Sequence, residues 1–168
     1  IVIDPVMVAK GGTRLINNTA ITHLKKKLLP LGFFVTPNIP EAEVLSGCSI
    51  SNKEDMIKAA KKILNMGSKN VLLKGGHLKS SMIFDILVTN KKIKIFSKKR
   101  IKTKNTHGTG CTLSSALATC ISQKKNILKS CKISLKYVDK AITYAPRYGK
   151  GFGPLNHLVL FNSKNLNG

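Results

Sequence analysis

A glycine-rich segment at residues 104–111, Lys-Asn-Thr-His-Gly-Thr-Gly-Cys, has the residue types of a phosphate-binding loop. Gly108 and Gly110 flank Thr109 directly before an apolar run that predicts a helix over residues 109–121. Glycines let the backbone turn tightly, so that several N–H groups can point at one anion, and the helix dipole adds to the attraction. The segment predicts an anion hole that could stabilise a transferring phosphoryl group. An ordinary helix-capping loop is the alternative.

Cys111 stands in the first turn of this predicted helix, where the same N–H groups favour a thiolate. A thiolate there could accept the proton of a substrate hydroxyl, which makes Cys111 a candidate catalytic base. The alternative is a small buried cysteine that does not react, as is expected for Cys120 on the same helix. The four cysteines of the chain lack the CxxC spacing of zinc sites, which argues against metal binding through sulfur.

Two further segments place polar side chains at the ends of predicted strands. Asn38 and Glu41 follow a strand at residues 33–36, and Asp4 ends a strand at residues 1–4. Carboxylate and amide oxygens at such positions suit Mg²⁺ or an ordered water, since Mg²⁺ needs oxygen ligands and usually reaches phosphates through them. The alternative roles are structural, with Glu41 capping the short helix that follows and Asp4 ending its strand.

Lys74 ends a predicted strand at residues 71–74 and precedes two glycines and His77. The glycines let the chain approach a ligand closely, and the lysine could hold a phosphate as a point charge. An ordinary surface position is the alternative for one lysine among many. His77, His107 and His157 are too separated along the sequence to indicate a histidine metal site.

The elements that must position these residues alternate between strands and helices. Short β-branched or apolar runs predict strands at residues 1–4, 33–36, 71–74, 83–88 and 93–96. Apolar spacing predicts helices at residues 19–29, 40–45, 51–67, 109–121 and 135–144. The third of these helices opens with a predicted capping box of Ser51 and Glu54. The alternation predicts an α/β fold with a mostly parallel sheet and an antiparallel edge pair.

Length and composition favour one compact domain over residues 1–161 and a polar tail at residues 162–168, in a chain of 168 residues. The formal net charge of +22 comes almost entirely from lysines spread along the chain. A solvated lysine-rich surface explains this distribution better than a nucleic-acid footprint, although a basic fragment that binds nucleic acid stays an alternative. The sequence shows neither a secretion signal nor an apolar run long enough to span a membrane, so a cytoplasmic location is expected.

Several motifs resemble one family in order and spacing. The segments DPVM, TPNIPEAEVLSG, VLLKGGH and KNTHGTGCTLSSALA resemble the hydroxymethylpyrimidine/phosphomethylpyrimidine kinases, which belong to the ribokinase superfamily. The segment GFGPLNH, at residues 151–157, is similar to the closing GxGPxxH of that family. Most ribokinase relatives carry aspartate where Cys111 stands. Cysteine at this position points to the pyrimidine kinases and to their pyridoxine-phosphorylating relatives.

The resemblance implies a three-layer α/β/α ribokinase-like fold and an ATP-dependent phosphotransferase that uses Mg²⁺. The implied reaction transfers the γ-phosphoryl group to hydroxymethylpyrimidine and then to its monophosphate, in thiamine biosynthesis. By position, Gly108, Thr109 and Gly110 would form the anion hole, with Cys111 in the catalytic-base position.

The same resemblance assigns residues to the nucleotide and the metal. Lys74, Asn38 and Thr106 would bind nucleotide or phosphate, and Asp4 and Glu41 would bind Mg²⁺. The pyridoxal and pyridoxine kinases share these motifs, so pyridoxal/pyridoxine kinase activity stays an alternative.

Relatives in this family carry an additional N-terminal region, which supplies strands of the sheet and much of the pyrimidine pocket. The chain is therefore expected to be an N-terminally truncated part of the family domain. Homodimerisation, which is common in the superfamily, is a further expectation from the resemblance.

Overall fold

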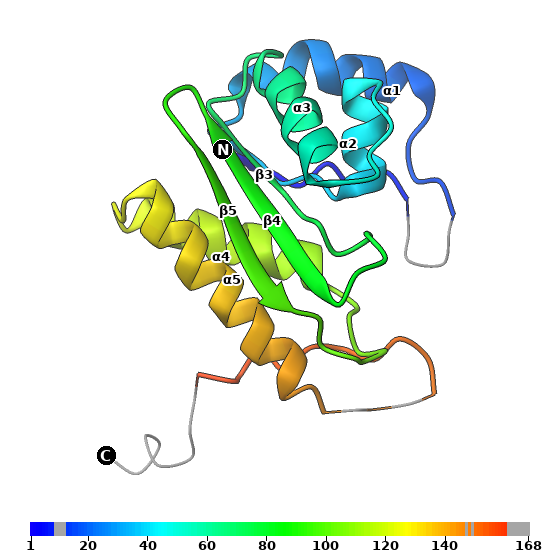
Figure 1. Cartoon of the computed structure of the whole chain (residues 1–168), viewed down its shortest axis with the longest axis vertical. Helices are drawn as coiled ribbons and strands as arrows, with labels where there is room; N and C mark the ends of the chain where they lie inside the picture. The colour runs from blue at the N-terminus through cyan, green and yellow to red at the C-terminus, as the bar shows by residue number, and fades with distance from the viewer. Residues whose placement is uncertain (9–12, 147, 149, 161–168) are drawn as a thin grey trace. The chain divides into compact units, whose positions relative to one another are not determined.

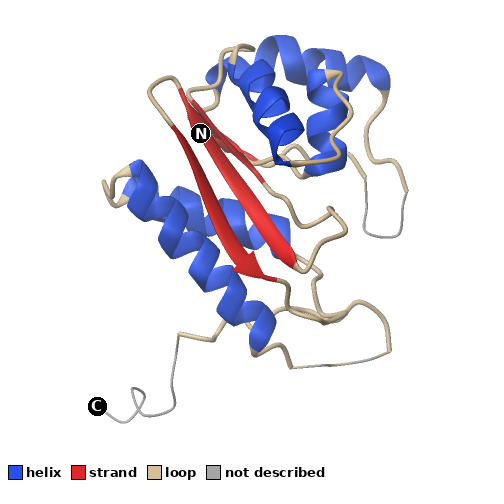
Figure 2. Cartoon of the chain, viewed as in Figure 1, coloured by secondary structure: helices blue, strands red, loops and turns tan. Residues whose placement is uncertain are grey.

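The chain divides into two compact units, one of residues Ile1–Arg100 and a second that begins at Ile101. The computed structural model describes residues 1–8, 13–146, 148 and 150–160, so the predicted tail at residues 162–168 lies outside the described residues. The first unit holds all strands of the described chain, and the second holds its last two helices (Figures 1 and 2). Within the same residues, no helix is both long enough and apolar enough to cross a membrane.

One mixed β-sheet forms the framework of the first unit, with the strand order β1-β2-β3-β4-β5. Its strands are β1 (Val2–Ile3), β2 (Phe34–Val35), β3 (Asn70–Leu73), β4 (Met82–Thr89) and β5 (Ile93–Lys99). All five strands were predicted, and β1, β2 and β3 pair in parallel, whereas the β3–β4 and β4–β5 pairs are antiparallel. The sheet is thus mixed rather than mostly parallel. The segment between β3 and β4 is too short for a crossover helix, so the chain returns antiparallel.

The helices of the first unit pack on the sheet through a shared apolar core. They are α1 (Asn18–His23), the π-helical turn η1 (Leu24–Leu28), the 3₁₀ turn η2 (Leu29–Leu31), α2 (Ile39–Ser46) and α3 (Lys53–Leu64). Side chains alternate between the two faces of a strand, so alternate strand residues enter this core. The core joins the sheet to α3 through Val71, Leu73, Ile86, Met56, Ala60 and Ile63.

The predicted helix at residues 19–29 is present, but it changes its geometry along its length. Asn17 caps α1, because its side chain accepts a hydrogen bond from the Ala20 N–H at 2.8 Å. The winding then widens into the π-helical η1, and Pro30 lies in the 3₁₀ turn η2 that ends the helix. Proline has no N–H to donate to the preceding turn, which explains why regular α-helix cannot continue through this position.

Helix α3 begins one residue later than the sequence predicts. Asn52 rather than Ser51 is its N-cap, and the Asn52 side chain accepts a hydrogen bond from the Asp55 N–H at 2.9 Å. Asp55 accepts in turn from the Ser51 N–H at 3.1 Å. Asn52 and Asp55 have the same spacing as Ser51 and Glu54, and serine and asparagine are equally good N-caps. The sequence pattern alone therefore could not choose between the two starts.

The second unit contains two helices, α4 (Thr109–Ser122) and α5 (Ile127–Thr143), which pack against each other. The prediction for α5 is wrong at its beginning, since the helix starts at Ile127 instead of residue 135. Asn126 is its N-cap and accepts a hydrogen bond from the Lys129 N–H at 2.8 Å. Ser130 and Ser134 are both buried in the first turns. Because these inward positions are polar, the sequence does not show an apolar residue at each turn of this part of the helix.

Candidate functional site

Polar side chains predicted from the sequence lie together at the carboxyl ends of β1, β2 and β3. Lys74 follows β3, and its Nζ lies 2.9 Å from Oδ1 of Asp4, which follows β1. The hydroxyl of Thr36, directly after β2, donates to the same carboxylate oxygen at 3.2 Å. The side chains of Lys74 and Asp4 are only 15% and 13% exposed. They therefore form a largely buried ion pair rather than two surface charges.

Asn38 and Glu41 start helix α2 close to this ion pair. The Asn38 side chain accepts a hydrogen bond from the Glu41 N–H at 2.9 Å, and the Glu41 carboxylate accepts one from the Asn38 N–H at 2.8 Å. This reciprocal arrangement is a capping box. The Lys74 N–H donates to the Pro37 carbonyl at 2.8 Å, and Lys74 and Asn38 form a parallel bridge. The structural role considered for Glu41 is thus realised, while ion binding by Asn38 and Glu41 stays a prediction.

Burial raises the pKa of Glu41, whose side chain is almost entirely inaccessible. Desolvation of the carboxylate is the largest influence, and the negative charge of Asp4 acts in the same direction. The hydrogen bonds from Asn38 and the positive charge of Lys74 lower the pKa, but they do not outweigh the burial. Glu41 therefore holds its proton more tightly in the folded chain than in the unfolded chain.

The free energy of unfolding should consequently fall as the pH rises from 4.5, the ordinary pKa of this carboxyl, through the raised pKa of Glu41. The contribution of Glu41 is complete below the unfolded pKa and is lost above the folded pKa, because the folded state binds the extra proton. Glu41→Gln keeps an oxygen for the Asn38 N–H but cannot titrate, so it should flatten this part of the curve in urea unfolding across the acidic range. Glu54→Gln, which neutralises an exposed glutamate in α3, is the matched control. A Glu41→Gln curve as steep as that of the wild type would contradict the assignment.

In the second unit, the glycine-rich segment forms the turn that starts α4. Gly108 is the N-cap residue, and its φ of 83° lies in the left-handed region that favours glycine. No side chain caps this helix. The Thr109 N–H makes only a long bond, 3.5 Å, to the Thr106 carbonyl. Within the described ranges, the N–H groups of Gly110 and Cys111 have no hydrogen-bond partner, as is usual for the first turn of a helix.

Thr106 precedes this turn along the chain, and Cys111 follows it. The Thr106 carbonyl accepts a hydrogen bond from the Thr109 hydroxyl at 2.8 Å, which supports the turn from the chain before it. Cys111 is exposed, whereas Cys120 and Cys131 are buried. Burial raises the pKa of Cys131 to about 12, which keeps that thiol protonated. Of these three cysteines, Cys111 alone can meet a ligand from solvent. The tight turn required by the predicted anion hole is present, and anion binding itself stays a prediction.

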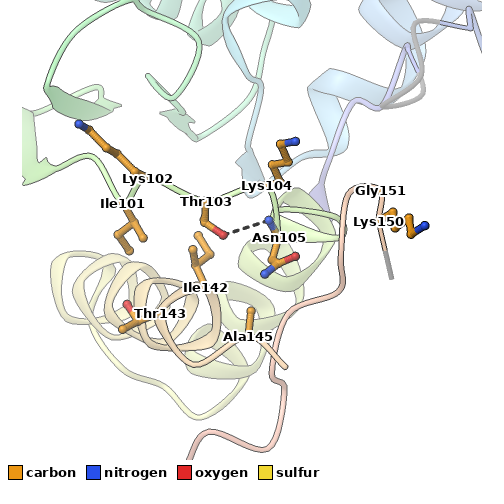
Figure 3. Close-up of a pocket in the computed structure, with 10 residues that line it drawn as sticks. All are labelled: Ile101, Lys102, Thr103, Lys104, Asn105, Ile142, Thr143, Ala145, Lys150 and Gly151. Atoms are coloured by element: carbon orange, nitrogen blue, oxygen red, sulfur yellow. Dashed lines mark hydrogen bonds between the residues drawn. The ribbon is translucent and has the colours of Figure 1, made fainter. Parts of the chain in front are cut away.

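A pocket of about 400 Å³ opens within the second unit, and Lys104 and Asn105, which precede this turn, are part of its wall (Figure 3). Asn105 belongs both to the pocket wall and to the glycine-rich segment, and its N–H donates to the Thr103 hydroxyl at 3.1 Å. The end of α5 contributes apolar atoms from Ile142, and Ala145 follows it. Lys102, Lys104 and Lys150 also belong to the wall, and Figure 3 shows their side chains extending away from Ile142 and Ala145. The wall is mainly polar, with a smaller apolar part from Ile142 and Ala145.

Sequence reasoning missed this pocket, as well as Thr36 and the contact between Thr112 and His157. The Thr112 hydroxyl lies 3.0 Å from Nε2 of His157, although the two residues are 45 positions apart. The sequence offered only the motif that ends in His157, since spacing along the chain does not reveal such contacts. Among the residues that the structure describes, no group of three or more His, Cys, Asp or Glu side chains could hold a metal ion.

Comparisons with known proteins agree on one family. Residues 1–156 match the family model described as phosphomethylpyrimidine kinase. The chain is 47% identical over 159 residues to a thiamine biosynthesis bifunctional protein of Geobacter sulfurreducens, covering 95% of the chain and 32% of that protein. It is 40% identical over 167 residues to the hydroxymethylpyrimidine/phosphomethylpyrimidine kinase of Staphylococcus aureus, covering 98% of the chain.

A solved structure of another vitamin kinase also matches nearly the whole chain. An ADP complex of Bacillus subtilis pyridoxal kinase matches 95% of the chain with a TM-score of 0.85 and 30% sequence identity. The chain spans 59% of that kinase and 60% of the Staphylococcus aureus relative. The similarity therefore covers nearly all of this chain but only part of each relative.

Proposed function

The chain belongs to the phosphomethylpyrimidine kinase family, and on this premise we propose that it carries the nucleotide- and phosphate-handling part of an ATP-dependent kinase. The proposed acceptors are hydroxymethylpyrimidine and its monophosphate, after the name of the Staphylococcus aureus relative. One observation carries the proposal: α4 starts without a side-chain cap, and the segment that leads into it lines a pocket in the same unit. The ribokinase-like three-layer arrangement is part of the proposal, supported by the match to pyridoxal kinase.

The nucleotide is proposed to bind in the pocket of the second unit. Ile142 and Ala145 would contact the base, and the lysines of the wall would attract the phosphates. The free N–H groups of Gly110 and Cys111 would bind oxygens of the transferring phosphoryl group, aided by the dipole of α4. The related pyridoxal kinase was solved with ADP, which supports an adenine nucleotide as the ligand.

Cys111 is proposed as the base of the transfer. Its thiolate would take the proton of the substrate hydroxyl while that oxygen forms a bond to the γ-phosphorus and the bond from phosphorus to the ADP oxygen breaks. In the transition state negative charge is spread over the three phosphoryl oxygens, where donors fixed in advance can stabilise it. The exposed position of Cys111 in the first turn of α4 is what supports this role.

The charged cluster of the first unit is proposed to handle Mg²⁺ and phosphate. Its donor set fits Mg²⁺, since Asp4 and Glu41 offer carboxylates and Mg²⁺ usually takes one or two carboxylates while keeping several waters. When bound, Mg²⁺ would neutralise phosphate charge. Lys74 has three donors on its ammonium group, so it could bind a phosphate oxygen while it keeps its contact with Asp4. Asn38 would support the cluster through the capping box.

Thermal unfolding with nucleotides tests the proposal. ADP or AMP-PCP with Mg²⁺, at about 100 times Kd, should stabilise the chain by about 2.7 kcal/mol, which corresponds to about 5–10 °C in Tm. Adenosine, which lacks phosphates, is the matched ligand control and should give a smaller shift. No shift with any adenine nucleotide would contradict the proposal. Binding to nucleic acid that falls steeply with salt, without nucleotide preference, would support the basic-fragment alternative.

Pyridoxal phosphorylation is the second candidate, favoured by the structural match to pyridoxal kinase. The higher identity to the pyrimidine kinase favours the first candidate. Competition between hydroxymethylpyrimidine and pyridoxal for the nucleotide-loaded chain would separate the two. Preferential binding of pyridoxal would reverse their order.

A further inference from the structure

The segment at residues 153–157, here called the C-terminal strap, runs beside the start of the glycine-rich turn. The Gly153 carbonyl accepts a hydrogen bond from the His107 N–H at 3.2 Å, and His107 and Pro154 form an isolated parallel bridge. A Cβ built on Gly153 would overlap Oδ1 of Asn105, so a larger residue at this position would have to displace the Asn105 side chain. The strap thus holds the segment that leads into Gly108.

The other end of the strap contacts the first turn of α4. Nε2 of His157 lies 3.0 Å from the Thr112 hydroxyl oxygen, and that hydroxyl lies 2.8 Å from the Gly108 carbonyl. A hydroxyl has one hydrogen, and a carbonyl can only accept. The Thr112 hydroxyl therefore donates to Gly108, and His157 must donate its Nε2–H to Thr112. Two consecutive hydrogen bonds therefore connect His157 to Thr112 and Thr112 to the carbonyl of Gly108, the N-cap residue of α4.

Helix α5 fixes the strap independently of the glycine-rich turn. The Tyr137 hydroxyl donates to the His157 carbonyl at 2.8 Å, and the Asn156 N–H donates to the Ala141 carbonyl at 3.0 Å. Leu155, directly before Asn156, is buried. Because the strap is anchored on α5, its position does not depend on the glycine-rich turn. The strap can therefore restrain the position of Gly108.

We propose that His157 and Thr112 are positioning residues, which hold the Gly108 peptide so that the N–H groups of Gly110 and Cys111 are preset for a phosphoryl group. This inference rests on the proposed nucleotide site and adds a role for the closing GFGPLNH motif. His157 acts only through Thr112 and does not contact the ligand. The conformational entropy of the turn is then lost when the chain folds, so that it does not reduce the affinity for the ligand.

Three single variants test this role through ADP affinity in titration calorimetry. His157→Ala and Thr112→Val should each weaken ADP binding about three- to tenfold, as expected for one lost hydrogen bond. Thr119→Val is the matched control, because the Thr119 hydroxyl makes the same type of bond in the same helix, 2.9 Å from the Ser115 carbonyl. It should bind ADP like the wild type.

Coupling and rescue separate positioning from a general loss of stability. The double variant His157→Ala/Thr112→Val should bind ADP no more weakly than the weaker single variant, since both changes break one chain of hydrogen bonds. His157→Gln keeps a side-chain N–H donor and should recover most of the affinity. Additive losses, or a Gln variant as weak as the Ala variant, would argue against the mechanism.

Amide chemical shifts of Gly108, Gly110 and Cys111 give a readout that does not require nucleotide. These shifts should change in His157→Ala and Thr112→Val but not in Thr119→Val. If the wild type failed to bind ADP while these shifts still moved, the nucleotide site would be wrong and the positioning contact would stand. Wild-type ADP affinity in both His157→Ala and Thr112→Val would overturn the inference.

Discussion

Replacing Cys111 with alanine is expected to slow phosphoryl transfer by at least about 100-fold, because a positioned general base contributes about 10²- to 10⁴-fold to such a step. ADP affinity should stay unchanged, since alanine keeps the main-chain N–H at the first turn of α4 and removes only the thiol. Release of ADP in the presence of hydroxymethylpyrimidine measures the first effect, and calorimetry with ADP measures the second. Wild-type turnover in the Cys111→Ala variant would exclude the thiol as the base.

Alkylation of the thiols checks the location of Cys111 without requiring turnover. Iodoacetamide should modify Cys111, which is exposed, and AMP-PCP should protect it. Cys48 serves as the internal control in the first unit, because hydrogen bonds with Lys62 and then Ser46 lower its pKa and favour its reactive form. Equal protection of both cysteines by the nucleotide would indicate a general stabilisation rather than a ligand at α4.

Replacing Lys74 with alanine is expected to destabilise the chain by about 3–5 kcal/mol, the usual cost of removing one partner of a buried ion pair. The Asp4 carboxylate would then lack its contact at 2.9 Å while remaining largely buried. Glu41, which is 5% exposed, would also lose the nearby positive charge that favours its ionised form. Urea unfolding at neutral pH measures this loss.

An exposed ion pair provides the control for the Lys74 variant. Lys58 lies 4.0 Å from Asp55 and its side chain is 75% exposed, so Lys58→Ala should change stability by less than about 1 kcal/mol. Acid offers a second check. The part of the loss that comes from Glu41 should shrink as the pH falls through the raised pKa of Glu41, because the protonated carboxyl no longer gains from the positive charge of Lys74. A loss that did not vary with pH would point to lost packing instead of lost charge.

The cluster around Lys74 was largely predictable, because it follows from the order of the strands. Asp4, Asn38 and Lys74 each follow a strand, and the carboxyl ends of parallel strands meet at one edge of a sheet. The direct contact between Lys74 and Asp4 was not predictable. It joins residues 70 positions apart, and only the register of three strands brings these two side chains to hydrogen-bonding distance.

The beginning of α5 and the contact of His157 could not be predicted from the sequence for a different reason. Both depend on polar residues in positions where an apolar pattern or a metal-ligand pattern gives no guidance. Ser130 and Ser134 are buried, so the inward face of α5 does not look apolar. The sequence marks His157 only as the end of the GFGPLNH motif and as too separated from the other histidines for a metal site, whereas its contact is a hydrogen bond to Thr112.

The capping box of Asn38 and Glu41 affects what can be concluded when these two residues are the same in related chains. Natural selection for a properly started α2 would preserve both residues even in a lineage that no longer phosphorylates anything. In a lineage that keeps the fold but has lost catalysis, mutation should therefore change Cys111, which is exposed, before it changes Asn38 or Glu41. Invariance of the capping pair among relatives would accordingly be poor proof of retained catalysis, whereas the fate of the cysteine would be informative.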